Sequence, residues 1–183
     1  MEAALDIEEL FEKYSPMVYN LALRLSGNKS DAQDIAQDAF IKAVRGLGNL
    51  REHSAAGTWL YRITMNVWKN RVRGEKRRSL WKTLSLDWGS DGDETPALQV
   101  KSPEEPAGTA IEKQEEKEAL EAAMAQLNPE ERAMLILREI DGRSYAEIAE
   151  ITEKPLGTVK SGISRAREAL RLKMNAVLND HGS

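Results

Sequence analysis

Residues 145–171 read YAEIAEITEKPLGTVKSGISRAREALR, a short apolar segment followed by a longer one rich in Lys and Arg. The apolar residues of the first segment recur at helical spacing, and Ser144 with Glu147 has the spacing of a capping box. Pro155 interrupts the pattern, and the break has the length of a helix-turn-helix connection. The stretch therefore predicts two helices joined by a tight turn.

The second of these helices has two different faces. One face is apolar and consists of Val159, Ile163, Ala166 and Leu170. Basic and hydroxyl residues project elsewhere: Lys160, Ser161, Ser164, Arg165 and Arg167. Cations neutralise phosphates and donate to guanine edges, and hydroxyls bond phosphates or bases. The pattern favours a helix that enters the major groove of DNA, although it also fits a bundle helix with a solvated basic face.

The charge of the chain is segregated, which the net value of −4 conceals. Residues 1–82 carry a net charge of +4 and residues 154–178 carry +5, whereas residues 83–121 carry −8. Clustered positive charge is a common feature of surfaces that bind nucleic acid. The sequence therefore indicates two such regions separated by an acidic segment.

The composition excludes several classes of site. The absence of Cys excludes disulfides, catalytic thiolates and Cys-based zinc sites from this sequence. The two His, His53 and His181, are far apart, and no motif of an enzyme active site or metal site is present. We therefore expect no enzyme activity, no metal and no cofactor. No apolar run approaches the about 20 residues that span a bilayer, and the acidic N-terminus is unlike a signal peptide, so we expect a cytoplasmic protein without membrane contact of its own.

The amino-terminal part shows helical periodicity. Apolar residues recur every three or four positions over residues 10–25, and Gly27 and Asn28 are expected to end this first helix. Ser30 with Gln33 has capping-box spacing and predicts the start of a second helix over residues 31–47. The apolar stripe predicted to face the core of this helix is Ile35, Ala39, Phe40, Ala43, Val44 and Leu47.

A third helix is predicted from about Thr58 to Arg78, and it carries the first basic patch. Trp59, Tyr61 and Trp68 precede or lie among its cations. Aromatic rings beside cations suit single-stranded nucleic acid, whose unstacked bases can lie on the rings. The same rings could instead fill the core. We expect core packing for Trp59, and both alternatives stay open for Trp68.

The pattern changes over residues 83–110, which are rich in Pro, Gly and acidic residues. This composition is typical of a flexible linker. Helical periodicity returns over residues 111–127, and Asn128 is expected to cap the next helix, with Pro129 at its first position and Glu131 at its third.

The chain is thus predicted to be all-α. Two small helical domains, residues 1–82 and 111–183, are joined by the acidic flexible linker of residues 83–110. No segment shows the sustained alternation that a β-strand would require.

Four stretches match one protein family in its order and spacing. They are DAQDIAQDAFIKAV, TWLYRITMNVWKNRVRGEKRR, LNPEERAMLILREIDGRSYAEIAEI and LGTVKSGISRAREALR. The chain resembles the extracytoplasmic-function (ECF) sigma factors of the sigma-70 family, the small initiation factors of bacterial RNA polymerase. The resemblance implies a region-two bundle in residues 1–82, a region-four helix-turn-helix in residues 111–183, and promoter-specific transcription initiation with the core polymerase.

The resemblance also implies three sets of site residues. The set that would dock on the clamp helices of the largest polymerase subunit is Asp34, Gln37, Asp38 and Phe40. The set that would melt and capture the −10 element as a single strand is Asn49, Arg51, His53, Ser54, Arg62, Asn66, Lys69, Asn70, Arg73 and Arg77. The set that would read the −35 element as duplex DNA is Thr158, Lys160, Ser161, Ser164, Arg165 and Arg167.

Further partners follow from the same resemblance. Region four would contact the flap of the second-largest polymerase subunit, and an anti-sigma factor would cover the polymerase-binding surfaces of both domains. Gly162 stands where the family often has Arg, which implies one missing DNA contact. The helix-turn-helix alone would also suit a free-standing transcriptional regulator. Such a regulator has no need for the aromatic and basic site of the amino-terminal half.

Overall fold

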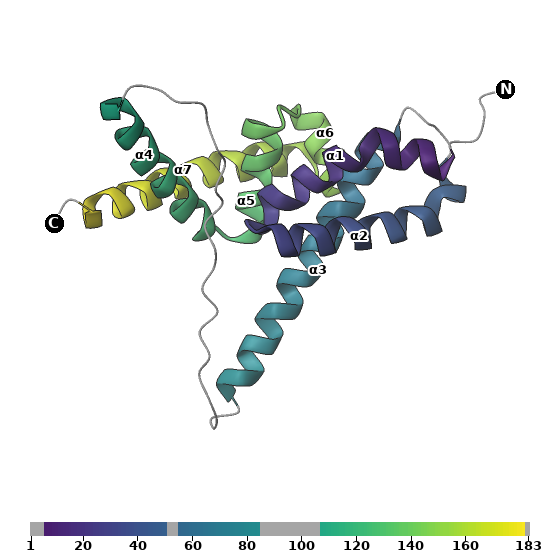
Figure 1. The fold of residues 1–183 in the computed structure, drawn as a ribbon, viewed down its shortest axis with the longest axis horizontal. Helices are drawn as coiled ribbons and strands as arrows, with labels where there is room; N and C mark the ends of the chain where they lie inside the picture. The colour runs from purple at the N-terminus through teal and green to yellow at the C-terminus, as the bar shows by residue number, and fades with distance from the viewer. Residues whose placement is uncertain (1–5, 51–54, 85–106, 182–183) are drawn as a thin grey trace. The chain divides into compact units, whose positions relative to one another are not determined.

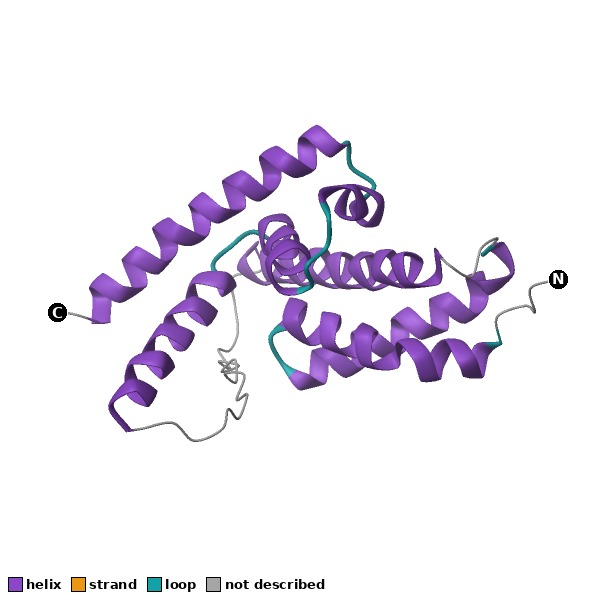
Figure 2. Ribbon diagram, turned by 90° about the horizontal axis from the view of Figure 1, so that it is seen from above, coloured by secondary structure: helices purple, strands orange, loops and turns teal. Residues whose placement is uncertain are grey.

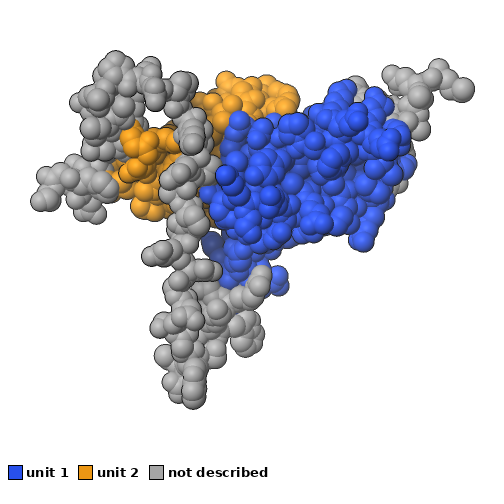
Figure 3. Space-filling view, viewed as in Figure 1, with its two compact units in different colours: residues 1–97, 150–153 blue, residues 98–149, 154–183 orange. Residues whose placement is uncertain are grey.

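The computed structural model of the chain describes residues 6–50, 55–84 and 107–181. These residues form helices, turns and no strand, so the all-α prediction is confirmed (Figures 1 and 2). The chain divides into two compact units, one of residues 1–97 with 150–153 and one of residues 98–149 with 154–183 (Figure 3). The predicted linker lies mostly outside the described residues, and its two ends belong to helices.

The described residues 6–50 and 55–84 of the first unit form three α-helices and a short 3₁₀ helix. Their bounds are α1 Ile7–Ser26, α2 Lys29–Gly46, η1 Leu47–Asn49 and α3 Ala56–Leu84. Each of the three α-helices packs against the other two. The α2 face in this core is built from Ala32, Ile35, Ala39 and Ala43, all without exposed surface. Three alanines in that row allow the neighbouring backbones to approach closely.

The turn between α1 and α2 differs from its prediction. Gly27 ends α1 in the left-handed conformation, with φ 84°, which glycine adopts without steric cost. The next residue, Asn28, is already extended, and its side chain accepts a hydrogen bond from the Asp31 N–H at 2.8 Å. The prediction that Ser30 caps α2 is therefore wrong, because Asn28 closes the first turn two residues earlier.

The predicted core stripe of α2 is also wider than the stripe that is buried. Val44 is 42% exposed, and Phe40 and Leu47 are half-buried. The alanine row occupies the face toward the core, so Phe40 and Val44 lie on its flank. Apolar periodicity alone cannot separate a buried stripe from an apolar flank.

Helix α3 resolves the alternatives for the aromatic residues. Trp68 is 4% exposed and Tyr61 5%, so both belong to the core and neither offers a ring to a nucleic-acid base. Trp59, expected in the core, is half-buried, and its Cζ2 lies 3.2 Å from where a Cβ at Gly46 would stand. After Trp68 none of the described α3 side chains, residues 69–77, is buried. The last turns of α3 thus extend away from α1 and α2 (Figure 1).

The described residues 107–181 form four α-helices and a π-helical segment, and all but the end of α6 belong to the second unit. Their bounds are α4 Ala107–Ala125, α5 Pro129–Leu135, η3 Ile136–Ile140, α6 Tyr145–Thr152 and α7 Leu156–His181. Helices α4 and α5 both pack against α7. A capping box starts α5 as predicted: Asn128 Oδ1 accepts from the Glu131 N–H at 2.9 Å, and Pro129 takes the first helical position.

The π-helical segment was not predicted. The Asp141 N–H donates to the Ile136 carbonyl at 2.9 Å, five residues back, which widens the turn. One residue added to a turn rotates the following positions by about 100°. Helical spacing in the sequence predicts an apolar face of Met134, Leu135, Leu137 and Ile140. Ile140 is instead 53% exposed, so the prediction is wrong for this residue.

The start of α6 follows the sequence prediction. The Glu147 N–H donates to Ser144 Oγ at 3.2 Å, and the Ser144 N–H donates to Glu147 Oε2 at 2.8 Å. Arg143 adds an ion pair at 2.9 Å. Hydrogen bonds from the Ser144 backbone, from Arg143 and from the Ser144 hydroxyl lower the pKa of Glu147 to about 2. The carboxylate therefore stays ionised at neutral pH and holds the entry to the helix-turn-helix.

Candidate polymerase and nucleic-acid interfaces

The predicted −10 residues of α3 share one face of that helix. They are Arg62, Asn66, Lys69, Asn70, Arg73 and Arg77. At about 100° per residue these positions fall within an arc of about 100°. Asn66, Asn70, Arg73 and Arg77 are exposed, and the other two are half-buried. We call this surface the α3 face; it carries four cations and two amides on the side of the helix turned away from the core.

The rest of the predicted −10 set lies before α3. Asn49 is the last residue of η1, and its backbone alone is described. Arg51, His53 and Ser54 lie outside the described residues. The structure therefore brings together the helical part of the set.

The predicted −35 residues all lie on exposed positions of α7. They are Thr158, Lys160, Ser161, Ser164, Arg165 and Arg167, and we call them the α7 face. Behind them Val159, Ile163 and Ala166 have no exposed surface, so the predicted apolar stripe is confirmed for these three residues. Leu170 is half-buried and packs on the cluster of Leu127, Leu135 and Ala166.

The cations of the α7 face differ in what they contact. Arg167 Nε and Nη2 donate to Glu139 Oε1 at 2.9 and 2.6 Å. This pairing raises the pKa of Arg167 above its ordinary value. Lys160 and Arg165 form no ion pair with any residue of the described ranges. Two cations are therefore available to an anionic ligand, while the third is shared with a carboxylate.

Gly162 does not belong to the α7 face. It is buried, and a Cβ there would lie 2.9 Å from Met134 Cε of α5 and closer still to its Sδ. A side chain at this position would point into the core of the unit. The Met134 atoms that this Cβ would meet are the far end of a flexible side chain, so the glycine leaves room for Met134; the missing DNA contact at Gly162 stays a prediction.

The predicted polymerase-binding set divides into two neighbouring surfaces of α2. Asp34, Gln37 and Asp38 are exposed at the spacing of one helix face, which we call the α2 edge. Phe40 lies on the flank of α2 next to α1. Its ring centroid is 4.9 Å from that of Phe11, with the rings tilted by 54°.

That flank borders an apolar groove of about 770 Å³ between α1 and α2. Its lining is Phe11, Ser15, Pro16, Tyr19, Gln33, Ala36, Gln37, Phe40, Ile41, Val44 and Arg45. Phe11 is 54% exposed and Ile41 is 43% exposed. Exposed apolar side chains between two helices, rimmed by polar groups, are typical of a groove that receives the apolar side of a partner helix. Apolar periodicity gives no sign of this groove, because it places Phe40 and Val44 in the core.

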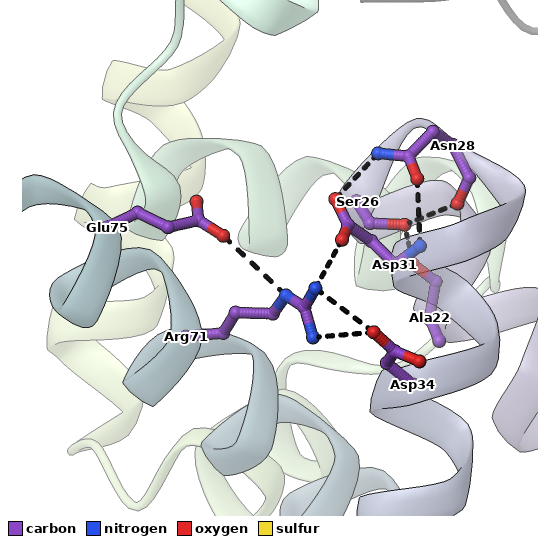
Figure 4. A network of polar contacts seen from close by, with 7 residues as sticks. All are labelled: Ala22, Ser26, Asn28, Asp31, Asp34, Arg71 and Glu75. Carbon is purple, nitrogen blue, oxygen red and sulfur yellow. Dashed lines mark hydrogen bonds and ion pairs between the residues drawn. The ribbon is translucent and has the colours of Figure 1, made fainter. Parts of the chain in front are cut away.

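Asp34 takes part in an ion-pair network that the sequence did not reveal (Figure 4). Arg71 of α3 donates to Asp34 Oδ2 from two nitrogens, each at 3.2 Å, and from Nη2 to Asp31 Oδ1. Glu75 lies 3.6 Å from Arg71 Nε. Burial of the guanidinium lowers the pKa of Arg71, but the ion pairs with Asp31 and Asp34 outweigh this effect and raise the pKa above its ordinary value. Residues 37 and 40 positions apart in sequence meet here, so no local spacing could predict the contact.

Within the described ranges no group of His, Asp and Glu is placed to hold a metal ion. Among the helices of those ranges, none combines the length and the apolar character that crossing a membrane requires.

Comparison with known proteins identifies the family. Two family models match, Sigma-70 region 2 over residues 10–78 and Sigma-70, region 4 over residues 117–170. The RNA polymerase sigma-H factor of Pseudomonas aeruginosa is 37% identical over 169 residues, covering 92% of this chain and 86% of that protein. The ECF RNA polymerase sigma-E factor of Escherichia coli K12 is 35% identical over 170 residues, with 92% and 86% covered. The chain belongs to the ECF sigma factors of the sigma-70 family.

A solved structure has the same fold. The sigma factor RpoE of Bartonella quintana, crystallised with the anti-sigma factor NepR, is matched with a TM-score of 0.65 at 22% identity, over 93% of this chain and 97% of that one. As a sigma factor, the protein is not an enzyme; it acts with bacterial RNA polymerase on promoter DNA. The region-2 match in the amino-terminal half favours this function over a free-standing helix-turn-helix regulator.

Proposed function

We propose that this sigma factor divides promoter recognition between the α3 face and the α7 face. The α3 face captures the −10 element as a melted single strand, together with Asn49, Arg51, His53 and Ser54. The α7 face reads the −35 element as a duplex. The observation that carries the proposal is that each unit presents a row of exposed or half-buried cations and amide or hydroxyl groups on one side of a helix. The opposite side is buried along the α7 face and along α3 as far as Trp68. Such rows can contact phosphates and base edges without disturbing a core.

Gln37 and Asp38 of the α2 edge and the groove beside them form the proposed polymerase-binding surface. Asp38 is exposed and has no ion-pair partner within the described ranges, so its charge is available to a basic partner. The groove offers apolar area next to that charge. A helix of the polymerase clamp with an apolar side and a basic side would satisfy both. In the second unit, region four contacts the flap of the second-largest subunit.

Three further assignments complete the proposal. Domain boundaries fall at residues 1–82 and 111–183, with residues 83–110 as the acidic linker. An anti-sigma factor covers the polymerase-binding surfaces. The solved relative RpoE was crystallised with its anti-sigma factor NepR, which supports this partner class. The protein acts in the cytoplasm, where bacterial polymerase is found.

The polymerase assignment is tested by Asp38→Arg. Reversing an exposed charge at a charged interface weakens association, and we expect about a tenfold loss of affinity for core polymerase without loss of helicity. The measurement is a fluorescence titration of the labelled sigma factor with core enzyme. Glu9→Arg is the control, because it makes the same charge change on an exposed part of α1 that does not line the groove. Equal affinity of Asp38→Arg and wild type would remove the α2 edge from the interface.

The nucleic-acid assignment is tested by Arg73→Gln. Arg73 is exposed on the α3 face, so its loss spares the core. We expect unchanged affinity for core polymerase and weaker binding of the holoenzyme to the single-stranded non-template strand of a promoter that it transcribes. The loss should shrink as salt rises, because a phosphate contact releases counterions. Wild-type affinity at every salt concentration would contradict the assignment.

A further inference from the structure

Arg71 lies where α3 leaves the core. Trp68 is the last buried side chain of the described part of that helix. Arg71 comes three residues later and is 31% exposed. At about 100° per residue it points about 150° away from the middle of the α3 face. Arg71 therefore cannot reach a nucleic acid bound to that face, although it belongs to the same basic stretch of sequence.

The guanidinium of Arg71 joins α3 to the beginning of α2 (Figure 4). It binds the carboxylates of Asp31 and Asp34, which lie one helical turn apart. Asp31 is itself held in place, because its Oδ2 accepts from Asn28 Nδ2 at 2.7 Å and its N–H donates to Asn28 Oδ1. The Ser26 hydroxyl donates to the carbonyls of Ala22 and Asn28, which ties in the end of α1.

This geometry restrains the direction of α3. A planar guanidinium that binds two carboxylates of α2 fixes orientation as well as distance. The part of α3 that carries Asn70, Arg73 and Arg77 has no buried side chain behind it. Its direction is therefore set where α3 leaves the core, at Arg71. Arg77 lies about 9 Å along the axis from Arg71, and a tilt of about 10° there would move it by about 1.5 Å. Displacements of that size are enough to weaken specific contacts.

We propose that Arg71 is a positioning residue for the α3 face and that Asp34 acts through Arg71 instead of contacting polymerase itself. The inference rests on the proposed function of the α3 face and the α2 edge. It divides two carboxylates that the family resemblance places in one set. Asp34 is engaged by two guanidinium nitrogens, whereas Asp38, one turn later, has no ion-pair partner among the described residues. Asp38 binds the polymerase, and Asp34 orients the helix that holds the promoter strand.

The test uses assembled holoenzyme and two readouts. One is the affinity of each sigma variant for core polymerase. The other is the affinity of the holoenzyme for the single-stranded non-template −10 segment of a promoter that it transcribes. For Arg71→Gln we expect core affinity within about twofold of wild type and about fivefold weaker binding of the oligonucleotide. Asp34→Asn should likewise keep its affinity for core polymerase and bind the oligonucleotide more weakly. The double variant should lose no more oligonucleotide affinity than Arg71→Gln alone.

Arg71→Lys separates positioning from general stability. Lys keeps the charge but lacks the planar fork, so it should restore part of the oligonucleotide affinity. Either of two results would overturn the inference. One is wild-type oligonucleotide binding by Arg71→Gln, and the other is a loss of core affinity in Asp34→Asn as large as that in Asp38→Asn.

Two controls show whether the proposed function has failed instead. Arg73→Gln must weaken oligonucleotide binding, and Asp38→Arg must weaken core binding. If neither control has its effect, the α3 face and the α2 edge are misassigned. If both have their effects and Arg71→Gln does not, the positioning role alone is refuted.

Discussion

The α3 face and the α7 face are similar in chemistry but are supported in different ways. Behind the α7 face Val159, Ile163 and Ala166 are without exposed surface. Behind the last described turns of α3 no side chain is buried, and a polar network at Arg71 is found instead. Apolar packing fixes one surface along its length, whereas ion pairs fix the other at a single point.

The difference implies different costs for substitutions in the two units. Close packing tolerates little change of side-chain volume. Substitutions of the buried residues behind the α7 face should therefore lower the free energy of unfolding. Exposed ion pairs contribute little to stability. Substitutions of Arg71 should therefore leave the protein folded but displace the residues that contact nucleic acid. Each of the following predictions tests one side of this contrast.

The largest effect is expected for Gly162→Arg. The new side chain would meet the end of the Met134 side chain inside the unit and force it to move. This overpacking should reduce the free energy of unfolding of this unit by about 1–3 kcal/mol. Thermal unfolding followed by circular dichroism measures the loss.

Gly157→Arg provides the matched control. It lies on the same helix, is exposed, and has nothing within 4 Å of the position of an added Cβ. Its stability should stay within about 0.5 kcal/mol of wild type. Similar stability for Gly162→Arg and Gly157→Arg would show that the α7 face is not held by close packing against α5.

Local chemistry explains which features could be predicted from the sequence. The capping boxes at Asn128 and Ser144 depend on residues three positions apart, so their spacing is visible in the chain. The apolar stripe of α7 was likewise correct at Val159, Ile163 and Ala166. The site residues on α3 and α7 came from the family resemblance, and the structure adds that both sets lie on exposed helix faces.

Long-range geometry explains what was missed. Arg71 pairs with carboxylates about 40 positions away, and no local pattern distinguishes it from its basic neighbours. The burial of Trp68 and of Gly162 depends on which helix crosses them. Ser30 failed as a cap because Asn28, also a good capping residue, came first after Gly27. The widened turn at residues 136–140 left no signal that periodicity could detect.

The next effect in size is expected for Arg165→Ala. Arg165 is exposed on the α7 face and pairs with no carboxylate of the described ranges, so its removal should spare the fold. If it contacts phosphate, holoenzyme affinity should fall about three- to tenfold on every −35 sequence, and the salt slope should fall by about 1. If it reads a guanine edge, the loss should be confined to the preferred sequence.

Binding of matched and altered −35 duplexes at several salt concentrations distinguishes these outcomes. Arg171→Ala serves as the comparison, because Arg171 is exposed on the same helix but already pairs with Glu168 at 2.6 Å. Wild-type affinity and salt slope for Arg165→Ala on all duplexes would remove Arg165 from the DNA interface.

A smaller effect is expected from acid titration of Glu147. Its pKa is lowered to about 2 in the folded protein, so the carboxylate stabilises the fold at neutral pH. This contribution is complete above the ordinary carboxyl pKa of about 4.5 and is lost as the pH falls toward about 2. Because the group is largely solvated, we expect Glu147→Gln to cost about 0.5–1 kcal/mol at pH 7.

The difference between Glu147→Gln and wild type should therefore narrow below about pH 4. Urea unfolding at a series of pH values measures it. Glu150→Gln, at an exposed position of the same helix outside the capping box, is the control and should show no such narrowing. A constant difference from pH 7 to pH 3 would contradict the role of the ionised carboxylate.

The smallest effect is expected for Arg167→Ala. Arg167 belongs to the α7 face but is paired with Glu139, so contacting DNA requires it to exchange one anionic partner for another. Affinity for the −35 duplex should change by less than about twofold, compared with the larger loss for Arg165→Ala. Glu139→Gln releases Arg167 and should raise the affinity by about twofold at low salt.

A double-mutant cycle decides whether that gain depends on Arg167. Removing a negative charge near DNA would strengthen binding even without the ion pair, and such a gain would persist in Glu139→Gln/Arg167→Ala. If Glu139 acts by holding Arg167, the gain should vanish in the double variant. Holoenzyme titrations of one −35 duplex at low salt with wild type, both single variants and the double variant complete the cycle. A persistent gain would show that Arg167 is as available to DNA as Arg165; its disappearance would show that Glu139 restrains Arg167 on the α7 face.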